Sequence, residues 1–379
     1  MGIWWAMSRQ RKLIILAGLG VLVCGVVLRS GCIPPRSFRA TKQPRTGRAL
    51  GGRVALVYSK HYQINMGGAE RLHPFDIRKY AKIFLALNTD GYILPADVFV
   101  PEAVTDEQVL LVHTDEFLAS LGNSDTVARY LEMPLIGKAP AFLIDAGILH
   151  AFRYATGGTI EAGRLALRYG IAVNLAGGYH HAMPDHGEGF NIYADLAIAI
   201  RVLRREGLIR RALVVDLDVH QGNGTAEIFG GDDEVFTFSM HQGNIYPVPK
   251  ATSDLDVELA GGTDDRTYLS LLGKHLPAVI DRARPDIVFL QAGCDVLASD
   301  PLASVAMTDE GLVARDAMVI DECVRRGLPV VMVLGGGYSK GAWQAQYASI
   351  RRTLRTYAFP SGPPHPTRPA TGKEAVYVK

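Results

Sequence analysis

Short apolar runs alternate along the chain with longer amphipathic segments. The run 212–215, Ala-Leu-Val-Val, is apolar on both faces and rich in β-branched residues, which is typical of a strand buried in a parallel sheet. The segment 194–206 is amphipathic and ends in basic residues, as expected of a helix on the surface of a sheet. Strands that alternate with helices of about 10 to 20 residues predict one α/β domain with a parallel sheet.

The same reading places the other elements. Predicted strands cover residues 53–58, 109–113, 171–175, 212–215, 234–240, 286–290 and 329–334. Predicted helices cover 77–87, 136–170 with a break at Gly157-Gly158, 194–206, 266–284 and 309–326, with a helical turn over 115–121, a short helix around Ala226 and a closing helix that ends near Tyr357. No repeat period suggests a solenoid.

Outside this pattern, the two ends of the chain have a different composition. Residues 13–28 are an uninterrupted apolar run that follows three basic residues and a Trp pair, which predicts a signal or membrane-anchor segment over residues 1–28. We expect a basic linker over 29–51, a catalytic domain over 52–358 and a Pro-rich tail over 359–379. The signal-like start is typical of a bacterial protein and predicts membrane association. Basic residues on both sides of the run leave the side of the membrane open.

Charge and cysteine content narrow the function. Nine of the 40 basic residues lie in residues 1–48, which contain no Asp or Glu, so the rest of the chain has 31 basic and 38 acidic residues and a net charge of −7. A mildly acidic body argues against nucleic acid as a partner. The four cysteines are too widely spaced for a disulfide framework or a Cys-x-x-Cys zinc site.

Polar clusters follow four of the predicted strands. They are His180-His181 after 171–175, the set Asp216, Asp218 and His220 after 212–215, Asp295 after 286–290, and Tyr338 after 329–334. The ligands of open α/β sheets bind beyond the carboxyl ends of the strands, and these ends lie along one edge. We therefore expect the clusters to converge although they are far apart in the sequence.

Asp218, His220 and Asp295 together offer two oxygens and one nitrogen to a divalent ion. Asp218 and His220 are two residues apart, so on an extended backbone they point the same way. Zinc suits this ligand set, and iron(II) or cobalt(II) would fit it too. Three protein ligands with an open fourth position are the arrangement of a catalytic zinc site, in which the metal lowers the pKa of a water.

A hydrolase also needs groups that move protons and bind the oxyanion. His180 and His181 can supply a base for the water and an acid for the leaving group, and Asp216 and Asn223 are available to tune them. Tyr338, on a triple-glycine turn, can donate a hydrogen bond to the developing oxyanion.

Each of these motifs alone has a structural explanation. An Asp-x-His pair is common by chance, and a His-His pair is as often structural as catalytic. The turn Gly335-Gly336-Gly337 lacks the Gly-Lys-Ser/Thr that completes a phosphate-binding loop. The joint occurrence of the motifs at strand ends is what indicates a metal-dependent hydrolase.

At this point the motifs resemble a known family. Residues 53–357 are similar in order and spacing to the zinc-dependent histone deacetylase family of the arginase/deacetylase superfamily. The matching motifs are Gly177-Gly178-Tyr179-His180-His181-Ala182, Gly189-Phe190, Asp216-Leu217-Asp218-Val219-His220-Gln221-Gly222-Asn223-Gly224, Gly293-Cys294-Asp295, Asp300-Pro301-Leu302 and Leu334-Gly335-Gly336-Gly337-Tyr338. Three further segments resemble the class IV branch: Tyr62-Gln63-Ile64-Asn65, His73-Pro74-Phe75-Asp76 and Thr156-Gly157-Gly158-Thr159.

The resemblance implies a fold and a metal site. The fold is a single open three-layer α/β/α sandwich with a mainly parallel sheet. One zinc ion per chain is bound by Asp218, His220 and Asp295. A structural potassium ion is held by backbone carbonyls around Asp216, Asp218, His220, Ser239 and Met240.

It also implies roles for the remaining residues. His181 is the general base and acid, with Asn223 behind it. His180 is its electrostatic partner, with Asp216 behind it. Tyr338 polarises the scissile carbonyl. Gly189 and Phe190 line the acyl-lysine channel, and Leu302 lies near its rim.

The predicted function is therefore zinc-dependent hydrolysis of an N-acyl amide, by deacetylation or defatty-acylation of acyl-lysine in a protein or of a small acylated amine. The alternatives are an acetylpolyamine-type deacetylase and a catalytically silent acyl-lysine-binding module. A binuclear manganese site of the arginase type is disfavoured because Gly222 stands where a further aspartate is needed. The oligomeric state stays open.

Overall fold

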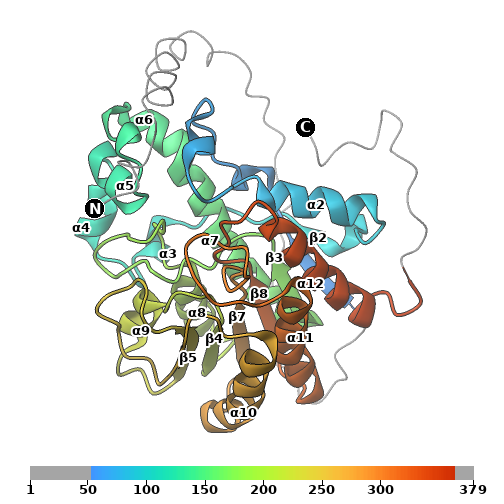
Figure 1. Cartoon of the computed structure of the whole chain (residues 1–379). Helices are drawn as coiled ribbons and strands as arrows, with labels where there is room; N and C mark the ends of the chain where they lie inside the picture. Colours follow the sequence, from blue (N-terminus) through green and yellow to red (C-terminus); the bar gives the residue numbers. More distant parts are fainter. Residues whose placement is uncertain (1–52, 363–379) are drawn as a thin grey trace.

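The computed structural model describes residues 53–362, and its centre is one open sheet (Figure 1). Within these residues the sheet has eight strands in the order β2-β1-β3-β8-β7-β4-β5-β6. Every neighbouring pair is parallel. The strands are β1 (Arg53–Val57), β2 (Val98–Phe99), β3 (Gly170–Asn174), β4 (Ala212–Asp216), β5 (Val235–Gln242), β6 (Leu255–Leu259), β7 (Ile287–Gln291) and β8 (Val330–Val333).

The central strands are buried along their whole length. Every residue of β3, β4, β7 and β8 is buried, in keeping with apolar runs that do not alternate with polar residues. The edge strand β6 is mostly half-buried and carries acidic residues. Burial thus concentrates the hydrophobic core around the middle of the sheet, where the candidate site lies.

Helices pack on both faces of the sheet (Figure 1). One layer is a row of neighbouring helices: α2 (Lys79–Thr89), α12 (Ala342–Tyr357), α11 (Asp309–Arg325) and α10 (Asp265–Ala283). The other is built on α7 (His150–Tyr169) and α8 (Asp195–Arg205), with α3 (Asp106–Val109) and α9 (Asn223–Phe229) against α8. The structure confirms the predicted three-layer α/β/α fold.

Shorter elements fill the connections. They are the helices α4 (Asp115–Ser120), α5 (Ser124–Tyr130) and α6 (Ala141–Ile144), the 3-10 helices η2 (Lys60–Tyr62), η3 (Ala69–Leu72), η4 (Pro95–Asp97) and η5 (Pro134–Lys138), and the π-helical turn η6 (Asp145–Leu149). The segment from η2 to η3 and the segment from α5 to α7 form one wall of the candidate site.

Two local predictions were wrong. Residues 109–113 are not a strand, because α3 ends at Val109 and a turn follows in which the buried His113 side chain accepts a hydrogen bond from Ala194. The pair Gly157-Gly158 does not break α7, which continues to Tyr169. A Cβ at Gly157 would lie 1.8 Å from the Glu102 carbonyl oxygen. These glycines therefore allow neighbouring segments to approach the helix closely. Strands β2 and β6 were not predicted.

The predicted membrane-associated location is also corrected. No helix within residues 53–362 is long and apolar enough to cross a membrane. The apolar run 13–28, on which that prediction was based, lies outside the described residues. The segments predicted over 1–28 and 29–51, and nearly all of the tail predicted over 359–379, lie outside them as well.

Candidate metal centre and active site

The polar clusters predicted at strand ends belong to four adjacent strands in the middle of the sheet. β3, β8, β7 and β4 are neighbours in that order. His180 and His181 follow β3, Tyr338 follows β8, Asp295 follows β7, and Asp218 and His220 follow β4. Because all four strands run the same way, their carboxyl ends deliver these side chains to one edge of the sheet.

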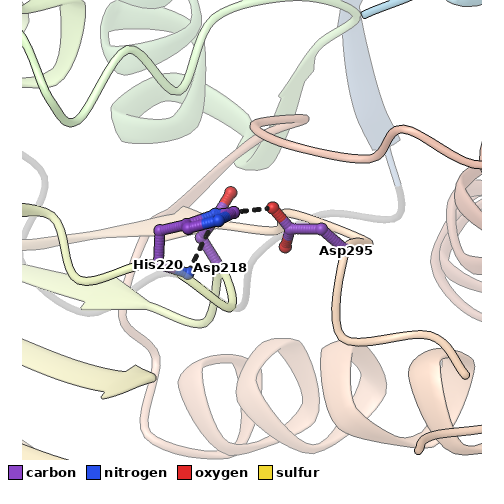
Figure 2. Close-up of side chains that lie close together, drawn as sticks. All are labelled: Asp218, His220 and Asp295. Atoms are coloured by element: carbon purple, nitrogen blue, oxygen red, sulfur yellow. Dashed lines mark hydrogen bonds and ion pairs between the residues drawn. The ribbon is translucent and has the colours of Figure 1, made fainter. Parts of the chain in front are cut away.

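Asp218, His220 and Asp295 form a buried cluster, and their candidate ligand atoms lie within 4.8 Å of one another. Figure 2 shows the three side chains close together, with a dashed line from the His220 ring to Asp295. Its Nδ1 atom is 3.2 Å from Asp218 Oδ1 and 3.2 Å from Asp295 Oδ2. The three side chains come from only two loops, those that follow β4 and β7.

Hydrogen bonds from the surrounding loops hold the two carboxylates. Asp218 Oδ2 accepts from Gln291 Nε2 at 2.9 Å and from the Gly336 backbone N–H at 2.8 Å. Asp295 Oδ1 accepts from the Val219 backbone N–H at 2.9 Å. Each carboxylate therefore keeps its other oxygen turned toward His220 and the centre of the cluster.

The electrostatics of this cluster fit a divalent cation. Burial, together with the neighbouring Asp218, raises the pKa of Asp295 to about 7. Burial disfavours a charged His220 ring, yet Asp218 and Asp295 outweigh it and raise the pKa of His220 to about 10. Two buried carboxylates this close together require positive charge between them. Zinc, which takes carboxylate and imidazole ligands, would supply that charge.

The two neighbouring histidines lie beside the cluster with different partners. Their ring centroids are 4.0 Å apart. His180 Nδ1 is 2.8 Å from Asp216 Oδ2, and His181 Nδ1 is 2.6 Å from Asn223 Oδ1. A charged carboxylate thus stands behind one histidine and a neutral amide behind the other.

The pKa values of the two histidines are shifted in opposite directions. Burial opposes charge on both rings. For His180 the carboxylates of Asp216 and Asp218 outweigh burial and raise its pKa to about 9. For His181, burial and the nearby His180 and His220 hold the pKa well below its usual range. These shifts favour a charged His180 and a neutral His181.

Tyr338 is held at the same place by its backbone. Its N–H donates to Asp300 Oδ2 at 2.8 Å, and its ring lies 6.3 Å from the His220 ring. Burial, then Asp295 and Asp218, raise the pKa of Tyr338 well above its usual value, so the hydroxyl keeps its proton. Lys79 holds the preceding glycines, because its buried Nζ donates to the Gly335 carbonyl at 2.8 Å and to the Gly336 carbonyl at 3.2 Å.

A pocket of about 770 Å³, including space open to solvent, leads to these residues. Its inner end is formed by His180, His181, Asp218 and Tyr338, and the predicted channel residues Gly189 and Phe190 line it. The remaining wall is mostly apolar and includes Ile64, Met66, Phe75, Ile77, Leu131, Met133, Ile148 and Phe152. These side chains come from the loops around η3 and α5 and from the helical region that leads into α7.

The structure places one predicted residue outside this wall and adds others that were not predicted. Leu302 does not line the pocket, although its N–H donates to Asp300, which also binds the Tyr338 backbone. Gln291 and Lys79 were missed because their polar groups act on loops far away in the sequence. A glutamine that ends an apolar strand was the available signal for Gln291.

Comparisons with known proteins find a family model and several relatives that match this chain. A family model described as "Histone deacetylase domain" matches residues 73–354. The chain is 34% identical to histone deacetylase 2 of Arabidopsis thaliana over 306 residues, covering 80% of this chain and 79% of that protein. It is 38% identical over 269 residues to a probable deacetylase of Methanothermobacter thermautotrophicus, covering 65% and 76%. An uncharacterized protein of Picosynechococcus is 41% identical over 278 residues, covering 73% and 90%.

A solved structure supports the fold. The crystal structure of the HDA15 HD domain matches with a TM-score of 0.63 and 22% sequence identity, covering 81% of this chain and 93% of that one. At this identity the likeness concerns the fold alone. It supports the open parallel sheet with helices on both faces.

Proposed function

The chain belongs to the histone deacetylase family, and we propose that it is a zinc-dependent deacylase that removes an acyl group from the side-chain amine of lysine. One observation carries this proposal. His180 and His181, which have different hydrogen-bond partners, lie at the inner end of an apolar pocket. Directly beside them is the buried cluster of two carboxylates and one imidazole. A base, an acid, an oxyanion donor and a metal site within one pocket are what amide hydrolysis requires.

Asp218, His220 and Asp295 would hold the zinc, one ion per chain; iron(II) is the other metal that this ligand set accommodates. A bound divalent ion supplies a Lewis acid for the amide carbonyl and lowers the pKa of a water to near neutrality. We further propose a structural potassium ion on the backbone carbonyls of Asp216, Asp218, His220, Ser239 and Met240. Its support is the parallel register, which sets Asp216 opposite Ser239.

The chain's own residues would carry the protons. His181, neutral and with Nδ1 directed at Asn223, has Nε2 available to take a proton from the attacking water and to return it to the leaving amine. His180, held cationic by Asp216, lies next to the developing negative charge. The Tyr338 hydroxyl, which keeps its proton, would donate a hydrogen bond to the oxyanion.

The apolar wall of the pocket favours binding of acyl groups longer than acetyl. Beyond the histidines, most of the wall is built from aliphatic, aromatic and methionine side chains of segments 64–80 and 131–152, with Glu70 and His73 as the polar members. An acyl chain that entered there would bury apolar surface at about 25 cal/mol per Å². We therefore propose that the enzyme accepts fatty-acyl lysine as well as acetyl-lysine.

An acyl-chain panel tests this function. The full chain loaded with zinc would be assayed on one lysine peptide carrying acetyl, octanoyl or myristoyl groups, with acetylputrescine as a small-amine comparison. We expect amine release from the peptides, with kcat/KM rising with acyl length. Preference for acetylputrescine would favour the acetylpolyamine-type alternative. Tight peptide binding without hydrolysis by the zinc-loaded chain would favour a silent acyl-lysine-binding module and overturn the proposal.

A further inference from the structure

Glu188 contacts two residues, Asn223 and Tyr246, that both contact His181, and it has no part in the chemistry described so far. Its Oε1 atom accepts hydrogen bonds from Asn223 Nδ2 and, at 2.9 Å, from the Tyr246 hydroxyl. At its other end, the Asn223 amide places Oδ1 2.6 Å from His181 Nδ1. The Tyr246 ring then packs edge-on against the His181 ring, with 4.9 Å between centroids.

The orientation of the Asn223 amide matters because a neutral imidazole has two tautomers. If the amide oxygen faces His181, Nδ1 must carry the hydrogen, and the lone pair is left on Nε2. If the amide turned over, its NH₂ group would donate to Nδ1 and favour the tautomer with hydrogen on Nε2. That tautomer could not take a proton from water at Nε2. A neutral Asn therefore serves the base only in one of its two orientations.

The groups around Asn223 select that orientation. An ionised carboxylate can only accept hydrogen bonds, so Glu188 forces the amide nitrogen toward itself and the amide oxygen toward His181. The Tyr246 hydroxyl holds the same carboxylate oxygen in place. The Asn223 amide contacts Glu188 and His181. His181 can donate or accept, depending on its tautomer, whereas the Glu188 carboxylate can only accept. Glu188 is thus the contact that determines which way the amide nitrogen and oxygen point.

The backbone around Glu188 is also pinned to His181. Gly189 has φ +54°, and a Cβ at this position would lie 2.6 Å from His181 Cδ2. The Glu188 carbonyl accepts from the Asn191 N–H at 2.9 Å, and Asn191 Oδ1 accepts from the His181 N–H at 2.8 Å. Glu188 therefore approaches Asn223 from a segment whose position relative to the histidine is fixed.

We propose that Glu188 is a positioning residue that locks the Asn223 amide and thereby fixes His181 in the tautomer that can act as the base. The inference rests on the proposed function, in which His181 Nε2 accepts the proton. Glu188 does not need to touch the substrate in this role. Its effect should therefore appear in kcat rather than in KM.

Single variants of the full zinc-loaded chain give the first test. We expect Glu188→Ala to lower kcat about 10- to 100-fold, as for other partners that orient an active-site histidine, with little change in KM. Glu188→Gln should cost less, because the glutamine oxygen can still accept from Asn223 although its amide can also turn. Glu227→Gln is the matched control, since Glu227 is an exposed carboxylate on α9, the helix that begins at Asn223. Asp185 is unsuitable, because its partner His186 also lies 3.6 Å from Glu188 Oε2.

A double variant separates amide locking from a general structural role. In N223D the new carboxylate presents an acceptor oxygen to His181 in either orientation, so Glu188 is no longer needed to select one. The new carboxylate, however, faces the carboxylate of Glu188. Glu188→Gln should then remove a repulsion and let the glutamine NH₂ group donate to that carboxylate. We expect Glu188→Gln to lower kcat in the wild-type background and to raise it in N223D.

The outcomes are distinguishable. If wild type hydrolyses acyl-lysine peptides but Glu188→Gln changes kcat in the same direction in both backgrounds, the lock is wrong and the proposed function stands. If the losses appear in KM and are larger for cationic substrates than for neutral ones, Glu188 reads the substrate instead. If wild type with bound zinc hydrolyses none of the peptides, the proposed function itself fails. Bound zinc and the thermal midpoint, measured for each variant, should match wild type.

Discussion

At the scale of single residues, two identical side chains next to each other in the sequence acquire different chemistry from their partners. A carboxylate behind His180 and an amide behind His181 separate their pKa values, although both rings are buried. His180 and His181 lie in a turn after β3, where one ring reaches Asp216 at the end of β4 and the other reaches Asn223 at the start of α9. Partner identity, rather than burial, therefore decides which histidine can act as the base.

Replacing the proposed base or oxyanion donor should reduce the chemical step. We expect His181→Ala to lower kcat about 10²- to 10⁴-fold and Tyr338→Phe about 10²- to 10³-fold in peptide deacylation assays. Tyr347→Phe is the matched control, because the Tyr347 hydroxyl on α12 donates to Asp90 at the end of α2 and Tyr347 does not line the pocket. Wild-type rates in both His181→Ala and Tyr338→Phe would contradict the assigned roles.

Removing a ligand carboxylate should remove the metal. Asp295→Asn takes one of the two charges from the cluster, and we expect bound zinc, measured by atomic spectroscopy, to fall from one equivalent to near zero, together with activity. Asp233→Asn, which changes an exposed carboxylate away from the pocket, should retain one equivalent. Two ions per wild-type chain would favour a binuclear site and contradict the mononuclear one.

At the scale of elements, loops at the strand ends are held from behind by buried donors. Arg315 on α11 is fully buried and donates to the carbonyls of Leu217, at 2.9 Å, and Gly293, at 2.8 Å. These carbonyls belong to the two loops that carry the candidate metal ligands. Lys79 on α2 holds the triple-glycine turn before Tyr338 in the same way. One helical layer thus fixes three of the four loops that build the site.

Two glycines in helices should respond to alanine in opposite ways. Gly157→Ala in α7 would place a Cβ 1.8 Å from the Glu102 carbonyl oxygen, so we expect a loss of about 1 to 3 kcal/mol in the free energy of unfolding. Gly273→Ala in α10 is the matched control, because its Cβ would meet Met318 only at 3.8 Å. That exposed substitution should stabilise the protein by about 0.5 to 1 kcal/mol. Chemical denaturation measures both, and equal effects would contradict the close packing of α7.

At the scale of the whole molecule, the sheet connects segments that are far apart in the sequence, and buried polar groups fix the connections. His113 is an example, since it is 3% exposed, stacks on Phe117 and accepts a hydrogen bond from Ala194 at 3.0 Å. It joins the turn after α3 to the start of α8. Burial lowers the pKa of His113 to about 4, so the folded protein holds it neutral.

This histidine should make folding stability depend on pH. Between about pH 6.5 and pH 4 the unfolded chain binds a proton at His113 that the folded protein excludes, so stability is lost as the pH falls through this window. The full effect of this shift is on the order of 3 kcal/mol. We expect His113→Gln, compared with wild type by denaturation at several pH values, to lose less stability over the window. Parallel curves would contradict a neutral, buried His113.

Much of the fold and of the site follows from local patterns in the sequence. The apolar runs of β3, β4, β7 and β8 and the amphipathic helices between them identify a parallel α/β sheet, because burial on both faces leaves a run with no polar side. Polar residues directly after those runs identify the candidate ligands and histidines, because strand ends are the one place where a buried strand can present polar side chains to a shared cavity. The short edge strands β2 and β6 lack such a run and could not be predicted.

Tertiary structure alone decided how those residues are held and what they face. Lys79, Gln291, Arg315 and Glu188 act on loops distant in sequence, and no local pattern indicates the partner of a buried polar group. The opposite pKa shifts of His180 and His181, the apolar wall of the pocket and the close packing at Gly157 also arise from segments brought together by the sheet. The sequence determined which chemical groups stand at the strand ends. The packing of distant segments decided their distances, their charges and the shape of the pocket that leads to them.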